Sequence, residues 1–133
     1  MLRRRELSDD VGGCASEWRY LLDAHKPPHG EGDWFGRLFW PLLQAAYEQS
    51  NLRMVYPSTA VNNLVVYKDG EVWRAPMEDR WPAVAVSSDG WYSVRSDAWS
   101  KDARELLATR DPREAAVFLA ELIGEIQSVD PEG

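Results

Sequence analysis

Residues 52–73 read LRMVYPSTAVNNLVVYKDGEVW, and within this stretch the chain changes from a helical pattern to a β pattern. Residues 34–50, just before it, place apolar side chains at helical spacing, whereas residues 63–68 form an apolar run typical of a strand. Between them lie Pro57 and a polar interval that ends in Asn63. We interpret this interval as a polar hinge that joins a helix to a sheet.

Two Asp-Gly pairs mark the β region that follows. Residues 63–75 contain Asp69-Gly70, and residues 82–95 contain Asp89-Gly90, in both cases between runs of β-forming residues. Asp-Gly favours the two positive-φ positions of a type I′ turn, so each segment is predicted to form a β-hairpin. Together the hairpins predict a four-strand antiparallel meander.

Helices are predicted on both sides of the meander. Ser16 is a candidate cap for a first helix, which ends before Pro27 and Pro28. Asp33 is a candidate cap for a second helix, and Pro41 either kinks this helix or begins it anew. These features predict two N-terminal helices.

The C-terminal third returns to a helical pattern. Residues 100–108 predict a short helix. A longer one opens with Asp111 as cap, Pro112 in the first position and Glu114 placed for a capping box. The predicted fold is therefore α+β, with two N-terminal helices, a four-strand antiparallel meander and two C-terminal helices packed on the sheet.

The length of 133 residues suits one domain with a single core. We expect this domain to span residues 14–127. The polar segment 1–13 is predicted to be disordered, and residues 128–133 are predicted to form a flexible tail.

The net charge and the cysteine content limit the partners and the cellular compartment that we expect for this protein. With 15 Lys and Arg against 22 Asp and Glu, the net charge of −7 argues against a nucleic-acid partner. No apolar run approaches the roughly 18 residues of a membrane span, so no membrane partner is expected. The lone Cys14 excludes a disulfide within the chain. We expect a cytoplasmic protein.

Few residues suggest catalytic or metal chemistry. The sequence contains no Gly-rich phosphate loop, no nucleophile elbow and no zinc-protease motif. Cys14 with His25 would imitate a nucleophile and its base. His25 and His29 would form a metal site only with Asp23 or Glu31, and two histidines beside a Pro-Pro loop are more often exposed to solvent. We therefore predict no metal and no cofactor.

Seven tryptophans are many for a domain of this size. Most should lie in the core. Trp73-Arg74 and Arg80-Trp81 each place a guanidinium beside an indole, and these are the residue types enriched at binding hot spots. Alternatively, these arginines only extend over apolar surface. Because the remaining aromatic surface would suit a symmetric partner, we expect a homodimer.

Residues 42–67 resemble a family of small actinobacterial natural-product biosynthesis proteins, and the similarity covers about the region from Trp34 to Trp91 and the helix opening at residues 111–116. The similarity lies in a helix ending in Ala-Ala-Tyr, followed by Leu52-Arg53, Tyr56-Pro57, Ser58-Thr59 and Asn63-Leu64. It extends to the lysinoalanine-forming enzymes of cinnamycin- and duramycin-type lantibiotics. This chain departs from the pattern at Ser58, where the family often has an aromatic residue.

The resemblance implies a protein that binds a modified ribosomal precursor peptide and catalyses an intramolecular crosslink such as lysinoalanine formation, without a cofactor. The polar hinge would then border a groove with aromatic walls, unless its side chains only satisfy the backbone of a turn. A protein-binding module without catalysis, such as an immunity or regulatory partner that covers a basic face, is the alternative. The expected substrate-binding residues are Trp34, Phe35, Arg53, Asn63, Arg74, Arg80 and Trp81.

Overall fold

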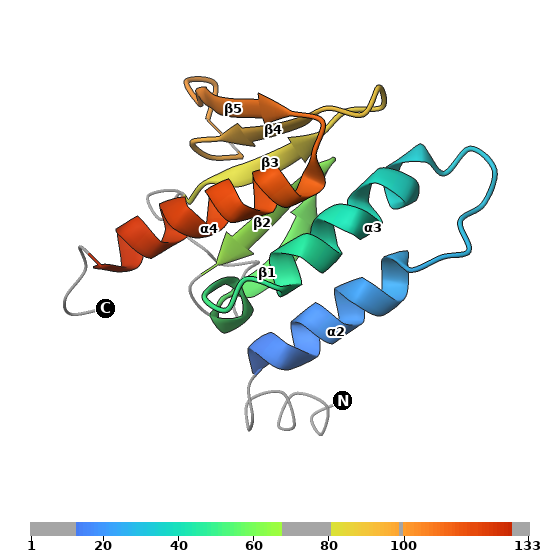
Figure 1. Cartoon of the computed structure of the whole chain (residues 1–133), viewed down its shortest axis with the longest axis horizontal. Coiled ribbons are helices and arrows are strands. Elements are labelled where there is room, and N and C mark those ends of the chain that lie inside the picture. Colours follow the sequence, from blue (N-terminus) through green and yellow to red (C-terminus); the bar gives the residue numbers. More distant parts are fainter. Residues whose placement is uncertain (1–12, 68–80, 99, 129–133) are drawn as a thin grey trace.

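The computed structural model describes residues 13–67, 81–98 and 100–128, and it has the α+β architecture expected from the sequence (Figure 1). The helices are α2 (Gly13–His25), α3 (Trp34–Tyr47) and α4 (Pro112–Ser128), with a 3-10 turn, η1 (Leu52–Met54), after α3. The strands are β1 (Tyr56–Ala60), β2 (Asn63–Tyr67), β3 (Ala83–Val86), β4 (Tyr92–Arg95) and β5 (Glu105–Thr109). None of the described helices is both long and apolar enough to cross a membrane.

The sheet is an antiparallel meander, as predicted, but the described residues form five strands rather than four. The strands lie in the order β1-β2-β3-β4-β5, and each pairs with its neighbours in antiparallel fashion. The predicted hairpin partner at residues 71–75 lies outside the described residues, and so do most of segment 1–13 and of the tail 128–133.

The polar hinge is itself a β-hairpin, which corrects the first interpretation of this interval. β1 and β2 pair from Tyr56↔Tyr67 to Ala60↔Asn63. They are joined by a two-residue turn in which Val61 has a φ of 58°. Asn63 Nδ2 donates to the carbonyl of Ala60 at 3.1 Å and so braces the turn. The turn was not predicted from the sequence because a β-branched residue such as Val61 rarely takes a positive φ.

β5 is the second correction, because residues 105–108 were predicted to belong to a short helix at residues 100–108. Arg, Glu, Leu and Ala favour helix, but intrinsic propensity is a weak preference that tertiary pairing overrides. Here β5 pairs with β4, and Ser96 N donates to the carbonyl of Arg104 at 2.9 Å where the connection closes.

The hairpin at Asp89-Gly90 is confirmed, although its turn differs from the one predicted. Gly90 N donates to the carbonyl of Ser87, and Ser87 N donates to that of Trp91, both at 3.0 Å. Gly90 has a φ of 94°, whereas Asp89 has a negative φ. One positive-φ residue and a three-residue loop define a turn closed by a Gly bulge rather than a type I′ turn.

Both predicted helix caps of the long helices are present. Asp33 Oδ1 accepts from Gly36 N at 2.9 Å, and α3 then continues through Pro41 as one helix. Asp111 Oδ1 accepts from Arg113 N at 2.9 Å at the start of α4.

The reciprocal capping box predicted for α4 is replaced by bonds through Thr109. Thr109 Oγ1 donates to Glu114 Oε1 at 2.6 Å and accepts from Asp111 N at 3.0 Å. The side chain of Thr109 therefore stands between the two capping residues and ties the end of β5 to α4.

The core lies between the sheet and the helices. α3 and α4 lie across one face of the sheet, and α2 packs along α3 and β1 (Figure 1). The side chain of Trp18 is fully buried, and its Nε1 donates to the carbonyls of Leu52 and Val55, both at 3.1 Å. These two bonds join α2 to the segment between α3 and β1.

We expect Trp18→Phe to lower the free energy of unfolding by about 1–3 kcal/mol because the buried Val55 carbonyl loses its donor, with a further loss from the smaller ring. Urea unfolding followed by circular dichroism measures the change. Trp91→Phe is the matched control, because Trp91 is 40% exposed and should cost no more than about 0.5 kcal/mol. Equal losses in the two variants would contradict a special role for the Trp18 indole.

Candidate functional site

Of the predicted site residues, those that the structure describes lie in different parts of the domain. Trp34 and Phe35 begin α3, whereas Arg53 follows its C-terminal end, and a helix of 14 residues is about 20 Å long. Asn63 lies in the β1–β2 turn, where its side chain bonds to the turn backbone. Arg74 and Arg80 lie outside the described residues. Substrate binding by any of these residues stays a prediction.

Trp34 and Phe35 belong to an aromatic cluster that joins α3 to α2. The Phe35 and Phe39 rings stack with centroids 4.6 Å apart, and the ring of His25 meets that of Phe39 edge-on at 4.9 Å. Trp34 meets Phe35 edge-on at 5.8 Å. Both predicted wall residues are half-buried and pack against the core, and Trp81 does the same. Helix packing therefore accounts for most of their contacts.

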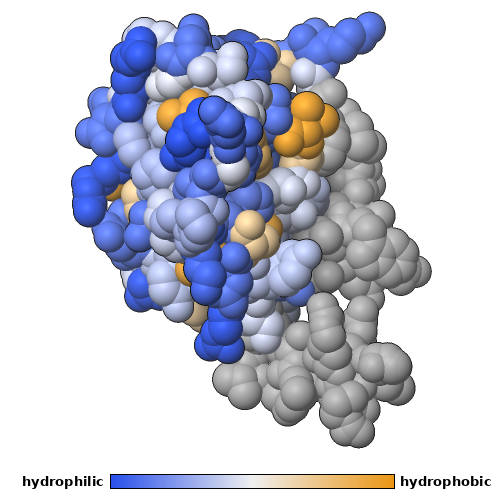
Figure 2. Space-filling view, turned by 90° about the vertical axis from the view of Figure 1, so that its right-hand side faces the viewer, coloured by the Kyte–Doolittle hydropathy of each residue, from blue (hydrophilic) through white to orange (hydrophobic). Residues whose placement is uncertain are grey.

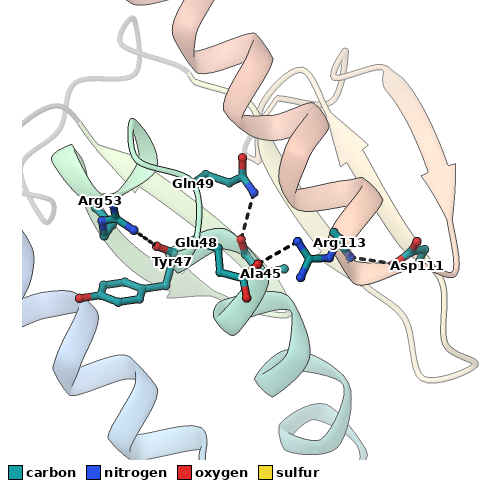
Figure 3. Close-up of polar contacts among 7 residues, drawn as sticks. All are labelled: Ala45, Tyr47, Glu48, Gln49, Arg53, Asp111 and Arg113. Atoms are coloured by element: carbon teal, nitrogen blue, oxygen red, sulfur yellow. Dashed lines mark hydrogen bonds and ion pairs between the residues drawn. The ribbon is translucent and has the colours of Figure 1, made fainter.

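Arg53 closes the end of α3 (Figure 3). Its Nη1 donates to the carbonyl of Tyr47 at 2.7 Å, and its guanidinium lies 5.5 Å from the centroid of the Tyr47 ring. A carbonyl in the last turn of a helix lacks an intrahelical donor, so Arg53 satisfies a group that the helix leaves open. Beside it, Arg113 and Glu48 form an ion pair at 2.9 Å between α4 and the end of α3.

The possible nucleophile and base are too far apart to react together. Cys14 and His25 lie at opposite ends of α2, 11 residues apart, which is about 17 Å along a helix. Burial raises the pKa of the Cys14 thiol, which disfavours the reactive thiolate.

The two histidines serve helix ends rather than a metal site. His25 Nδ1 lies 3.0 Å from the carbonyl oxygen of Leu21, and His29 Nε2 lies 2.6 Å from that of His25. Since a carbonyl oxygen only accepts, each ring donates its proton there and closes the C-terminal end of α2. In the described part of the chain no group of three or more His, Cys, Asp or Glu side chains is placed to hold a metal ion.

Trp91 and Arg110 form an exposed pair that sequence reasoning missed. Among the five tryptophans that the structure describes, Trp91 is the exposed one. The Arg110 guanidinium lies 5.2 Å from its ring centroid, and Arg110 Nη2 donates to the carbonyl of Asp89 at 3.1 Å. A Cβ at Gly90 would lie 3.2 Å from this Nη2, so the glycine leaves room for the arginine. We call these two side chains the Trp91–Arg110 pair.

The fold brings the pair together at one end of the sheet. Trp91 precedes β4 and Arg110 follows β5, and the pairing Tyr92↔Thr109 places the two ends next to each other. Tyr92 also donates its hydroxyl to the carbonyl of Leu38 at 2.7 Å, which ties this end to α3. The pair was missed because β5 was predicted to be helical, and a helix there would not place Arg110 beside Trp91.

The surface around the described residues shows no broad apolar area on the face drawn in Figure 2. There, hydrophobic residues form separate spots among hydrophilic ones. Trp34, Trp40 and Trp81 are half-buried and Trp18 is fully buried. Exposed tryptophan in the described chain is therefore confined to Trp91, which removes part of the reasoning for a homodimer. The homodimer itself stays a prediction.

Comparison with known proteins identified no relative of this chain. No protein-family model matches the chain, and neither a curated protein nor a solved structure matches it.

The Trp91–Arg110 pair can be tested by a double-mutant cycle. We expect a coupling energy of about 0.5–1 kcal/mol between Trp91→Ala and Arg110→Ala, as for an exposed cation–π contact. Urea unfolding of the two single variants and of the double variant measures it. A matched cycle with Tyr20→Ala and Arg110→Ala should give no coupling, since Tyr20 is an exposed residue of α2. Additive losses at Trp91 and Arg110 would contradict the contact.

Tyr92 predicts an alkaline sensitivity. Burial, and then the negative charge of Asp111, raise its pKa above the ordinary value of 10.0. The folded state holds the phenol proton more tightly than the unfolded state, so this stabilisation is complete below pH 10 and is lost as the pH rises beyond it. We expect Tyr92→Phe to lose less stability than the parent between about pH 8 and about pH 11 in urea unfolding. Tyr20→Phe is the control, and an unchanged alkaline loss in Tyr92→Phe would contradict the assignment.

Proposed function

We propose that the protein binds a ribosomal precursor peptide in natural-product biosynthesis, with the Trp91–Arg110 pair as the anchor of its binding surface. The observation that carries the proposal is an indole that is 40% exposed and held beneath a guanidinium. Trp and Arg are both enriched at binding hot spots. The net charge of −7 argues against nucleic acid as the partner.

The pair is prepared for binding before a ligand arrives. The β3–β4 turn holds Trp91, and the bond from Arg110 to the Asp89 carbonyl holds the guanidinium over the ring. Ordering a long side chain at an interface costs roughly 0.5–1.5 kcal/mol, and much of that cost is already met here. The Tyr92 hydroxyl bond to Leu38 anchors the adjacent residue to α3.

The biosynthetic context rests on the resemblance of residues 42–67. Several positions that carry it have structural roles in this chain. Leu52 is a core residue, Arg53 closes α3, and Asn63 braces the β1–β2 turn. At these positions the residues that carry the resemblance support the connection of α3 to β2, and the resemblance extends along the chain to about Trp91.

The finer part of the proposal is lysinoalanine closure. In that reaction the lysine amine adds to the β-carbon of a dehydroalanine, and the proton lost from nitrogen is balanced by one gained at the α-carbon. The step needs no oxidant and no leaving group. A protein that holds the two ends together supplies effective molarity, which reaches roughly 7–11 kcal/mol in favourable cases. In this mechanism the protein contributes binding of the precursor, and the Trp91–Arg110 pair is the proposed anchor.

Co-expression with a dehydrated cinnamycin-type precursor, which contains lysine and dehydroalanine, tests the proposal. Ring closure leaves the peptide mass unchanged, so the peptide is treated with 2-mercaptoethanol, which adds to open dehydroalanine and increases the mass. We expect the protein to protect the precursor from this addition. Trp91→Ala should weaken precursor binding by about thirtyfold, which corresponds to about 2 kcal/mol for a hot-spot residue.

Tyr20→Ala is the matched control, because it removes another exposed aromatic side chain from a different helix. Binding of the precursor without protection from the thiol would favour a non-catalytic binding module over a crosslinking enzyme. The proposal would be overturned if the protein did not bind the precursor. It would also be overturned if the genomic locus lacked both a precursor peptide and a dehydratase.

A further inference from the structure

Val61 occupies a position that valine fits poorly. It begins the two-residue turn between β1 and β2 with a φ of 58°, whereas Asn62 has a negative φ. A hairpin turn with a positive φ only at its first position usually has glycine there, because a β-branched side chain is strained in the left-handed region. The chain therefore keeps a strained residue where glycine would relieve the strain.

The side chain of Val61 is also open to water. It is 86% exposed, more than any other large apolar side chain in the described part of the chain. Burial in the core therefore does not offset the strain in the backbone. Strained backbone residues cluster at functional sites, where the strain serves binding or catalysis. Val61 is thus a candidate for contact with a ligand.

The turn that carries Val61 lies at the same end of the sheet as Trp91. Val86, in β3, donates its N–H to the carbonyl of Asn62 at 2.9 Å, and its partner in β4 is Tyr92. Val61 and Trp91 each adjoin a member of this row. Because neighbouring strands are antiparallel, β1, β3 and β5 all run toward this end of the sheet (Figure 1).

The spacing of the strands gives the distance between the two apolar side chains. Neighbouring strands lie about 4.8 Å apart, so Asn62, in line with β2, is about 10 Å from Trp91, in line with β4. Val61 lies one residue further, toward β1, which raises the separation to about 13 Å. Between them, Asn62, Ser87 and Ser88 are exposed, polar and uncharged.

An extended peptide matches this arrangement. Along an extended chain the side chains of residues i and i+4 point to the same side and lie about 13 Å apart. The uncharged polar groups between the two contacts suit hydrogen bonding to a peptide backbone.

A second copy of the chain fits the same surface less well. A stable dimer buries about 800 Å² on each partner. A large aromatic ring buries only about 150–250 Å², and a valine buries less. Two apolar side chains separated by polar residues are therefore enough for a peptide segment and too few for a dimer interface.

We propose that Val61 is a second contact of the binding surface that Trp91 anchors, and that this surface takes an extended, uncharged peptide segment with apolar side chains at positions i and i+4. One of these side chains packs on Val61 and the other on the Trp91 ring. The strained turn holds Val61 out in solvent until the ligand covers it. This inference rests on the proposed function, since it specifies which part of a precursor peptide the surface recognises.

The test uses the full chain and two peptides of the same composition, with affinities measured by nuclear magnetic resonance titration. Acetyl-Ser-Leu-Thr-Ser-Thr-Leu-Ser-amide places its leucines at i and i+4, whereas acetyl-Ser-Thr-Ser-Leu-Leu-Thr-Ser-amide places them side by side. We expect the first peptide to bind about tenfold more tightly, because only its leucines reach both contacts. Equal binding of the two peptides, or no binding of the first, would overturn the inference.

Three variants separate a role in binding from a role in the fold. Val61→Gly removes both the side chain and the strain, so it should melt no lower than the parent and bind the first peptide about tenfold more weakly. Val61→Asn also tolerates a positive φ and should bind as weakly as Val61→Gly. Met54→Ala is the matched control and should leave binding unchanged, because Met54 is 70% exposed and precedes β1 at the opposite end of the sheet.

Several results would contradict the role of Val61. If Val61→Gly melted several degrees below the parent, the valine would serve the fold, and if it bound the first peptide as tightly as the parent, the ligand would not reach this turn. An equal loss of binding in Met54→Ala would also overturn the inference. A concentration-dependent dimer that Val61→Gly abolishes would identify a second copy as the occupant instead.

The outcomes also separate this inference from the proposed function. If Trp91→Ala weakens precursor binding but Val61→Gly does not, the proposed function stands and the second contact is wrong. If Val61→Gly weakens binding of the first peptide but the parent protein neither binds nor protects the precursor, the second contact stands and the biosynthetic role is wrong.

Discussion

The indole N–H of Trp18 reaches across the domain to the segment that determines where the helical layer ends and the sheet begins. Its two acceptors, the carbonyls of Leu52 and Val55, flank the short turn between α3 and β1. The Leu52 carbonyl also accepts from Val55 N at 3.2 Å, whereas the Val55 carbonyl, beside a fully buried side chain, takes its donor from the indole. By supplying it, Trp18 holds α2 against this turn and sets the direction in which β1 enters the sheet.

The same turn connects the helical layer to its second half. Asn51 is the residue before Leu52, and its Nδ2 donates to the carbonyl of Ala120 in α4 at 2.8 Å. Arg53 closes α3 two residues later. The side chains of Trp18, Asn51 and Arg53 therefore all form hydrogen bonds at or beside this turn, and together they join α2, α3 and α4.

At the other end of the sheet the polar contacts serve a surface instead of the core. Thr109 links β5 to the cap of α4, and the next residue, Arg110, lies over Trp91. The rigid parts of this end are the β3–β4 turn and the Tyr92 hydroxyl bond to α3. This end of the sheet thus combines an exposed indole with a support that is bonded to α3. We regard this combination as the most informative functional feature of the described chain.

Local patterns were enough to locate several features. Asp33 and Asp111 begin helices, Pro27 and Pro28 end one, and Asp89-Gly90 closes a hairpin, because each of these effects involves residues only a few positions apart. The α+β class followed from the same signals. β1, β5 and the Trp91–Arg110 pair were decided by contacts between distant residues. Val61 takes a conformation that its type disfavours, residues 105–109 pair with β4 against their helical preference, and Arg110 meets Trp91 only through that pairing. Pairing energy between strands outweighs local propensity in these places, and no short stretch of sequence contains that energy.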